Sequence, residues 1–203
     1  MTSSIAKTPS AKPLLFTPIK IRELVARNRI IASPMCQYLS VDGAPSDWQL
    51  MHLGRLAIGG CGIVFGEETA VEPDGRKTHS CAGLYKQSHV ACYRKITDMI
   101  KSNGALPAIQ LGHSGRKGSC HGAMEDWKAL DKSDAANGLP PWQVMTPTSA
   151  VSPPRPIPHK EMDQDDINRV IDDFRTATKR SIDAGYEIVE LSLIHISEPT
   201  RLQ

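Results

Sequence analysis

The chain has 203 residues, of which 40% are hydrophobic and 23% charged, so it is long enough for one globular domain with a sizeable core. Its formal net charge of +2 gives no reason to expect nucleic acid or a membrane surface as a partner. The five cysteines are scattered and form no C-x-x-C pair, which indicates reduced thiols in a cytoplasmic protein and no metal site. No apolar run approaches the roughly 20 residues of a membrane span.

The first predicted elements are a short hairpin and a buried strand. Residues 1–13 carry no apolar segment of the kind found in signal peptides, and they predict a disordered lead-in. Residues 14–24 predict a hairpin that turns at Thr17-Pro18. Residues 29–34 predict a buried strand, and Asp42-Gly43 is a turn signal in the loop after it.

Three further strands then alternate with helices. Ser46 predicts the N-cap of a helix over residues 47–59, and Ser88 that of a helix over residues 89–102. Residues 118–160 lack periodicity and contain many prolines, which indicates a long functional or lid-like loop. Buried strands are expected at residues 63–65, 106–111 and 186–190, and the longest helix, residues 163–184 before Gly185, has an apolar stripe of Ile167, Val170, Ile171, Phe174, Ala177 and Ile182.

This alternation of strand, loop and helix predicts an α/β fold with a parallel sheet. A doubly wound nucleotide-binding fold would carry G-x-G-x-x-G after its first strand, and the chain has no such motif. The hairpin before the first strand and the polar clusters after three strands instead favour a TIM (β/α)₈ barrel. Because a full barrel needs roughly 250 residues and eight strands, the chain is expected to form the N-terminal half, about four βα units.

Several segments in order along residues 14–190 carry the motifs of one known family. They are Leu15-Phe16-Thr17-Pro18, Asn28-Arg29-Ile30, Ser33-Pro34-Met35-Cys36-x-Tyr38, Glu67-x-Thr69-Ala70-Val71-x-Pro73-x-Gly75-Arg76, Gln110-Leu111-x-His113-x-Gly115-Arg116-Lys117 and Gly185-Tyr186-x-Ile188-x-Glu190. Together they resemble the Old Yellow Enzyme family of FMN-dependent ene-reductases, in its bacterial-type class with a cysteine beside the flavin. Glu68 and Gly112 depart from the pattern, because the family usually has alanine at both positions.

The resemblance implies a flavin reaction. NAD(P)H would reduce FMN, and the flavin would pass hydride to the activated C=C bond of an α,β-unsaturated carbonyl compound. The expected partner is therefore a small-molecule alkene, and a homo-oligomer is also among the family expectations. The resemblance implies that residues 14–190 are a truncated FMN-binding TIM-barrel domain.

The same resemblance assigns the site residues. Cys36 and Tyr38 are the candidate catalytic residues: the thiol beside the flavin would adjust its potential, and the phenol would bind the substrate carbonyl. Gln110 suits the pyrimidine edge of a flavin because an amide both donates and accepts hydrogen bonds. The candidate cofactor-binding residues are Ser33, Pro34, Met35, Cys36, Glu68 and Gln110. We expect His113 to be structural.

The end of the chain raises two alternatives. The string from Leu191 to Arg201 resembles the translation of a transposase sequencing adapter, so residues 191–203 are expected to be a non-native tail. On that interpretation the chain is an inactive truncated fragment without stable flavin binding. The other alternative is the N-terminal part of a related dienoyl-CoA reductase or amine dehydrogenase, although Cys36 favours the simple reductase.

Overall fold

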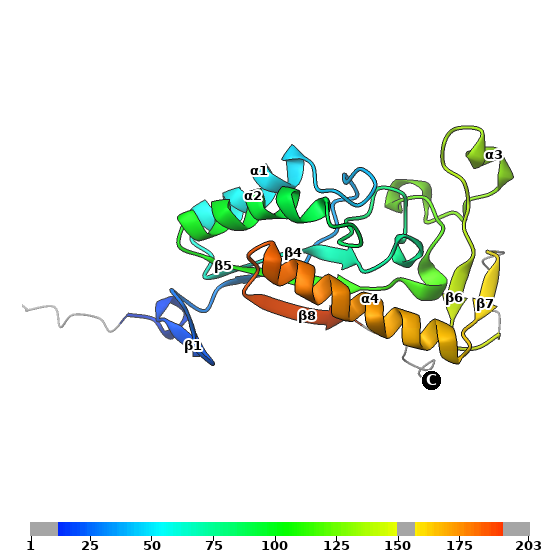
Figure 1. Ribbon diagram of the computed structural model, residues 1–203. Helices are drawn as coiled ribbons and strands as arrows, with labels where there is room; N and C mark the ends of the chain where they lie inside the picture. Colours follow the sequence, from blue (N-terminus) through cyan, green and yellow to red (C-terminus); the bar gives the residue numbers. More distant parts are fainter. Residues whose placement is uncertain (1–11, 150–156, 193–203) are drawn as a thin grey trace, which may run out of the picture.

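The computed structural model describes residues 12–149 and 157–192, and its centre is a four-stranded parallel sheet (Figure 1). The strand order is β3-β4-β5-β8, so each strand of the sheet lies beside the one that precedes it. The sheet strands are β3 (Ile31–Ala32), β4 (Ile63–Ala70), β5 (Leu106–Gly112) and β8 (Ile188–Ser192), and the helices between them are α1 (Asp47–Ile58), α2 (His89–Ser102) and α4 (Gln164–Asp183). Most of the predicted lead-in 1–13 and tail 191–203 lies outside the described residues.

The predicted fold class is confirmed. Successive parallel strands, each joined to the next through a helix, form the arrangement of the first half of a (β/α)₈ barrel. Leu191 and Ser192 extend β8 and pair with Leu111 and Gly112 of β5. Whether residues 191–203 are native stays a prediction.

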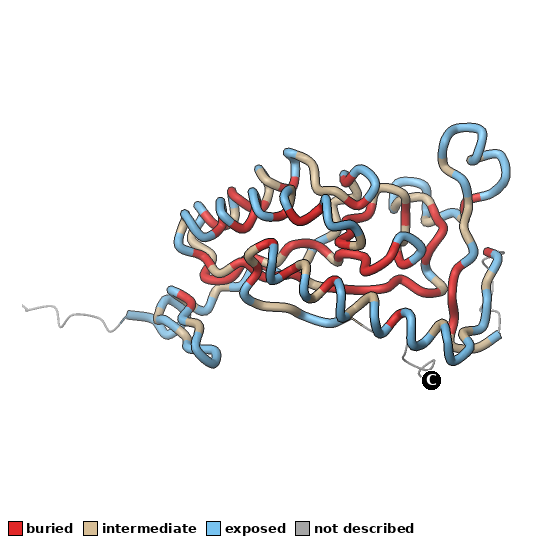
Figure 2. The backbone as a smooth tube through the Cα atoms, viewed as in Figure 1, coloured by how far each residue is buried: buried red, intermediate tan, exposed pale blue. Residues whose placement is uncertain are grey.

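The main core lies between this sheet and its helices. Val64 of β4 and Ile109 of β5 pack in one buried cluster with Leu53 of α1, Ile100 of α2 and Ala177 of α4. Figure 2 shows the same distribution, with the central strands and the inner sides of the helices buried. Full burial of a side chain such as Ile100 stabilises the fold by about 1.5–3 kcal/mol. Among the described residues, no helix has the length and apolarity needed to cross a bilayer.

The helix ends follow the sequence signals in all but one case. Ser46 caps α1 as predicted, in a capping box with Gln49. Gly104 and Gly185 follow α2 and α4 with left-handed φ values of 73° and 91°. The predicted cap at Ser88 is wrong: its φ of −62° and ψ of −25° are already helical, and its side chain accepts no cap hydrogen bond.

The hairpin is present but displaced along the sequence. Leu14–Phe16 forms a 3₁₀ turn, because both the N–H and the hydroxyl of Thr17 bond to the Leu14 carbonyl oxygen. The strands are instead β1 (Ile19–Ile21) and β2 (Leu24–Ala26), which pair in antiparallel fashion. Arg22, with a φ of 53°, reverses the chain between them.

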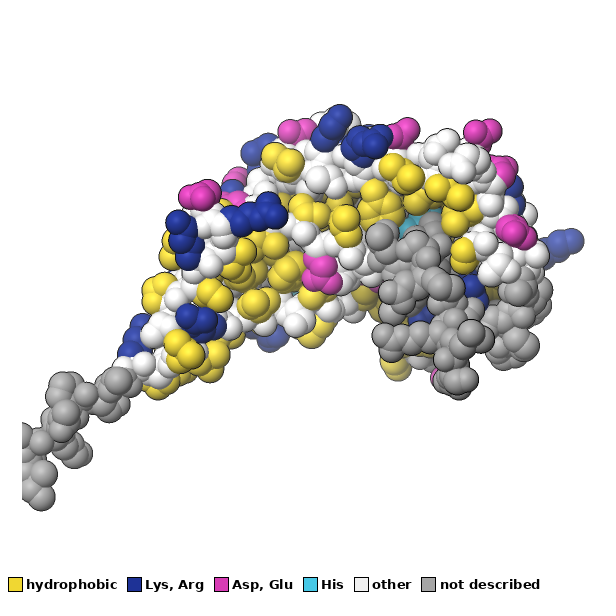
Figure 3. Space-filling view, turned by 90° about the horizontal axis from the view of Figure 1, so that it is seen from below, with side chains coloured by type: hydrophobic (Ala, Val, Ile, Leu, Met, Phe, Trp, Pro, Cys, Tyr) yellow, Lys and Arg dark blue, Asp and Glu magenta, His cyan; other side chains and the backbone are white. Residues whose placement is uncertain are grey.

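The first strand of the sheet is shorter and more exposed than predicted. Residues 29–34 give only the two-residue strand β3, since β3 pairs with β4 alone and Pro34 has no N–H to donate. Ile31 is 50% exposed, and Leu191 in the opposite outer strand is 56% exposed. Figure 3 shows exposed hydrophobic side chains across the face seen from below.

The predicted stripe on the longest helix is also only partly right. Val170 and Ala177 are buried, with Phe174 packed beside them. Ile171 and Ile182 lie about a quarter of a turn away from that line and are 49% and 64% exposed. Within the described part of the predicted loop 118–160 are the short elements α3 (Lys132–Ala135), β6 (Val144–Thr146) and β7 (His159–Glu161).

Candidate active site

The carboxyl ends of the parallel strands bring the predicted site residues together. Residues 33–38 follow β3, while Glu68 lies in β4 and Gln110 in β5. The register places Glu68 opposite Gln110, and Gln110 opposite Glu190 of β8. Three polar side chains therefore stand in one row on adjacent strands, at the end of the sheet where barrel enzymes hold their active sites.

A bulge in β4 sets the direction of its two glutamates. Phe65 pairs with Ala108 and Glu68 pairs with Gln110, so Gly66 and Glu67 together stand opposite a single residue. Without the extra residue, Glu67 would share the face of Phe65. Instead, Glu67 lines a cavity with residues of α1 and α2, whereas Glu68 shares the row with Gln110.

The segment 33–38 presents alternate side chains to solvent. Ser33 and Met35 are exposed, while Pro34, Cys36 and Tyr38 are half-buried. Tyr38 has a φ of 55°, a left-handed backbone that a tyrosine rarely adopts. Its ring meets Trp127 edge to face, with centroids 5.4 Å apart, so the loop after β5 packs against the segment.

Cys36 and Tyr38 are both protonated at neutral pH. Burial raises the pKa of the Cys36 thiol from 9.0 to about 11, although the Lys77 ammonium opposes this shift. Burial, reinforced by the neighbouring Cys36, raises the pKa of Tyr38 well above its usual range. The segment therefore offers a neutral thiol and a neutral phenol, and the phenol can donate a hydrogen bond.

Glu68 forms a mostly buried ion pair with Lys77. Its carboxylate bonds the Lys77 ammonium, and both side chains are less than one-fifth exposed, at 15% and 17%. Burial lowers the pKa of the Lys77 ammonium, but the charge and hydrogen bond of Glu68 outweigh it and the net shift is upward. A Cβ atom on Gly112 would stand 2.6 Å from Glu68 Oε1. The two departures from the family pattern are thus one packing feature, because Glu68 occupies the space that an alanine at position 112 would need.

Gln110 is oriented by the neighbouring strand. Its Nε2 donates to Glu190 Oε1 over 2.6 Å, which leaves its Oε1 as an acceptor. His113 is structural, as expected, because it is 1% exposed and its Nε2 lies 2.7 Å from Glu72 Oε1. Within residues 12–149 and 157–192, no three His, Cys, Asp or Glu side chains are placed to hold a metal ion.

A larger cavity adjoins the segment 33–38 on the side of the long loop. Its volume is about 390 Å³, which is large enough for a small organic molecule. It is lined by Gln37, Tyr38, Thr78, His79, Ser80, Cys120, His121, Gly122, Ala123, Met124, Glu125, Leu130 and Leu139. The predicted role of the loop 118–160 is consistent with this position, since most of the cavity wall comes from that loop.

Sequence reasoning missed Lys77, Glu67 and Glu190 as members of this site. Glu67 and Glu190 belong to the motifs that carried the resemblance. The sequence around a carboxylate on a strand, however, does not indicate which residue that carboxylate will bond. Lys77 lies nine residues after Glu68. This spacing does not predict an ion pair, because the two side chains meet only after the chain turns back at Pro73–Gly75.

The comparisons with known proteins agree on one family. The model of the NADH:flavin oxidoreductase / NADH oxidase family matches residues 14–196. The chain belongs to this family. It is 34% identical over 190 residues to an NADH:flavin oxidoreductase from Gibberella zeae, covering 92% of this chain and 45% of that protein. It is 31% identical over 183 residues to the NADPH dehydrogenase of Bacillus subtilis, covering 89% of this chain and 48% of that enzyme.

Solved structures show the same fold. Morphinone reductase superimposes with a TM-score of 0.73 at 23% identity, covering 92% of this chain and 49% of that chain. An Old Yellow Enzyme from Pichia gives a TM-score of 0.71 at 21% identity, covering 88% of this chain and 45% of that one. The chain thus spans about half the length of the relatives that it matches, and the predicted family resemblance is confirmed. The family consists of oxidoreductases that use FMN with NAD(P)H as reductant.

Proposed function

We propose that the chain belongs to an FMN-dependent ene-reductase, which transfers hydride from NAD(P)H through the flavin to the activated C=C bond of an α,β-unsaturated carbonyl compound. The observation that carries this proposal is the placement of Gln110 and the segment 33–38 at one end of the sheet. A neutral Tyr38 and a cavity of about 390 Å³ adjoin them.

The residues present fit the ring system of a flavin. The hydrogen bond from its Nε2 to Glu190 orients the Gln110 amide. Its Oε1 can then accept from the ring N3–H. Ser33 and Met35 are exposed on the same end of the sheet and can meet the flat face of the ring. Glu68 would lie beside the ring as a neutralised ion pair with Lys77, so Glu68 itself brings no unpaired charge to the flavin.

The flavin, when bound, supplies the hydride transfer. The chain's own residues bind and orient the substrate. Tyr38 donates its phenolic hydrogen to the substrate carbonyl oxygen, which draws electrons from the C=C bond. The substrate itself lies in the cavity between Tyr38 and the loop after β5. Cys36 would place a neutral thiol beside the flavin.

A chimera tests this proposal. Residues 14–190 replace the matching half of the Bacillus subtilis NADPH dehydrogenase, and NADPH oxidation is measured with and without 2-cyclohexen-1-one. Tyr38→Phe should lower kcat/KM for the enone by roughly 10- to 100-fold, the effect of losing one hydrogen bond to developing charge. Tyr85→Phe is the matched control, since the Tyr85 hydroxyl contacts Asp42 outside the site. A flavin-loaded chimera whose NADPH oxidation does not respond to enone would refute the proposal.

The alternative of a fragment without stable flavin binding concerns the 203-residue chain alone. It stays a prediction, and quenching of FMN fluorescence by the purified chain measures it directly. Tight binding would disprove it without affecting the chimera result. A cytoplasmic location and a homo-oligomeric parent also stay predictions, as does the dienoyl-CoA reductase or amine dehydrogenase alternative.

A further inference from the structure

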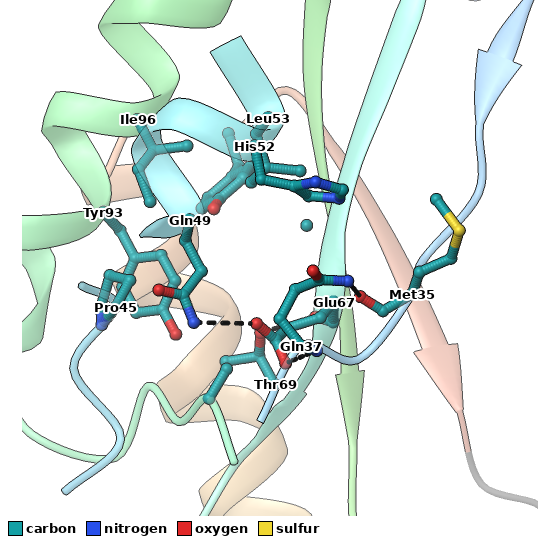
Figure 4. Close-up of a pocket in the computed structure, with 13 residues that line it drawn as sticks. Met35, Gln37, Pro45, Gln49, His52, Leu53, Glu67, Thr69, Tyr93 and Ile96 are labelled. Carbon is teal, nitrogen blue, oxygen red and sulfur yellow. Dashed lines mark hydrogen bonds between the residues drawn. The ribbon is translucent and has the colours of Figure 1, made fainter. Parts of the chain in front are cut away.

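Glu67 lies behind the segment 33–38, on the side of the sheet that faces α1 (Figure 4). It is only 6% exposed. Its Oε2 accepts the Gln37 backbone N–H over 2.9 Å, and its Oε1 accepts Nε2 of Gln49 over 3.1 Å. One carboxylate therefore joins the segment that carries Cys36 to helix α1.

The orientation of the Gln49 amide is fixed from the helix end. Its Oε1 accepts the Ser46 N–H over 2.8 Å and the Ser46 hydroxyl over 2.7 Å, which forms the capping box of α1. Its Nε2 also donates to Ser40 Oγ over 3.1 Å. Turning the amide around would break the cap, so Gln49 can only donate towards Glu67. Both oxygens of Glu67 must then be acceptors, which a carboxylate satisfies and an amide does not.

The cavity beside Glu67 is too small for a substrate. Its volume is about 10 Å³, roughly the space of one water molecule. Leu53, Ile96 and the rings of Tyr93 and Tyr186 form much of its wall. Glu67 therefore meets neither substrate nor cofactor from this side, and any influence on the reaction passes through the segment 33–38.

We propose that Glu67 is a positioning residue, whose carboxylate is held by Gln49 and fixes the Gln37 backbone, and with it the turn that carries Cys36 and Tyr38. The left-handed backbone of Tyr38 needs such support, because a non-glycine residue at a φ of 55° is held there by its surroundings. The purpose of this positioning rests on the proposed function; the hydrogen-bond arrangement does not.

The groups around Glu67 give it no counter-charge. Burial raises the pKa of Glu67, while the hydrogen bonds from Gln37 and Gln49 lower it. His52 of α1 lines the same cavity, but burial lowers its pKa, so it is neutral near pH 7. The facing titratable groups are His52 on α1, Tyr93 on α2 and Tyr186 before β8, with Cys36 and the Glu68–Lys77 pair on the side of the segment. The carboxylate is thus held by hydrogen-bond donors.

Exchanging the two side chains tests this arrangement on the 203-residue chain without flavin. Glu67→Gln puts an amide N–H against either the Gln37 N–H or the Gln49 N–H. The double variant Glu67→Gln/Gln49→Glu reverses the polarity of the pair: the carboxylate at position 49 still accepts from Ser46, and the amide at position 67 donates to it while accepting from Gln37. The moved charge lies in the first turn of α1, where the helix dipole favours it.

Two quantities are measured on each variant. Hydrogen exchange by NMR reports the protection of the Gln37 amide, and mass spectrometry reports the rate of Cys36 alkylation. Glu67→Gln should lower the Gln37 protection factor and raise the alkylation rate by about tenfold each, the effect of one lost hydrogen bond to a charged group. The double variant should return both to within about threefold of the wild-type values.

Glu72→Gln is the matched control, because Glu72 is equally buried at 7% exposed but bonds His113 and Arg169 instead of the segment. It should leave both quantities unchanged. The proposal is overturned if Glu67→Gln changes neither quantity, if Glu72→Gln changes them equally, or if the double variant fails to restore them. Should Glu67→Gln not fold, the double variant decides alone. Since no flavin is used, a failure here is distinct from a failure of the chimera.

Discussion

Replacing His113 with leucine perturbs a buried polar network that ties the ends of β4 and β5 to α4. The His113 Nδ1 accepts the Gly115 N–H over 3.0 Å, so the ring hydrogen is on Nε2, which donates to Glu72. Arg169 of α4 forms an ion pair with the same carboxylate. The Glu72 side chain is only 9% exposed, and His113 is one of its two partners.

The expected loss of stability follows from these contacts. Leucine has a similar volume but removes the hydrogen bond to a charged, buried acceptor, which is worth about 1.5–3 kcal/mol. It also leaves the buried Gly115 N–H without its acceptor. We expect a total loss of about 3 kcal/mol in the free energy of unfolding, or about 6–12 °C in Tm for a chain of this length.

The loss should depend on pH. Burial raises the pKa of Glu72, but His113 and Arg169 outweigh it and the net shift is downward from 4.5. A lowered pKa in the folded state stabilises the protein fully above the unfolded value, and this stabilisation disappears as the pH falls through the folded value. His113→Leu should therefore lower Tm more at pH 7 than near pH 3.5.

Thermal unfolding followed by circular dichroism at both pH values measures the effect. His121→Leu is the control, since His121 bonds Asp134 over 3.1 Å in the peripheral loop and its loss should lower Tm by less. The reasoning fails if His113→Leu lowers Tm equally at both pH values, or no more than His121→Leu does.

Three further predictions concern the site and its support. Gly112→Ala should lower Tm, because the new Cβ would stand 2.6 Å from Glu68 Oε1. It should lower Tm less in a Glu68→Ala background, where that atom is absent, and equal losses in both backgrounds would contradict this. The rate of Cys36 alkylation should rise with pH towards a midpoint of about 11. Lys77→Met should move that midpoint upward by removing a nearby positive charge, and an unchanged midpoint would exclude this effect of Lys77 on the thiol. Ser46→Ala should cost about 1 kcal/mol in chemical denaturation through loss of the α1 cap, and a neutral result would refute it.

Sequence signals correctly predicted helix ends that are determined by residues close together in the chain. Ser46 caps α1 because its oxygen reaches an N–H within the same turn, and Gly185 ends α4 because it adopts a left-handed φ. The prediction of buried residues failed where burial depends on a segment from elsewhere in the chain. Ile171 and Ile182 belong to an apolar pattern, but the described neighbours of α4 cover only the line through Val170 and Ala177.

The candidate site divides in the same way. Cys36, Tyr38 and Gln110 were found from motifs at strand ends, because parallel strands bring their carboxyl ends to one edge of the sheet. The partners of Glu67 and Glu68 were not found. A bulge of one residue in β4 sets which face of the sheet each of these adjacent glutamates occupies, and no sequence pattern in the strand predicts the bulge.

The sequence by itself determined the family, the parallel α/β architecture and the candidate residues that we propose approach the flavin. These depend on hydrophobic periodicity and on short motifs, which lie within single segments. Only the tertiary structure decided which carboxylates are paired, that Glu68 and Gly112 share one space, and that Glu67 links the segment 33–38 to α1. The physical reason is that hydrogen bonds and steric contacts depend on side-chain direction, which is set by strand register and by neighbours distant in the chain.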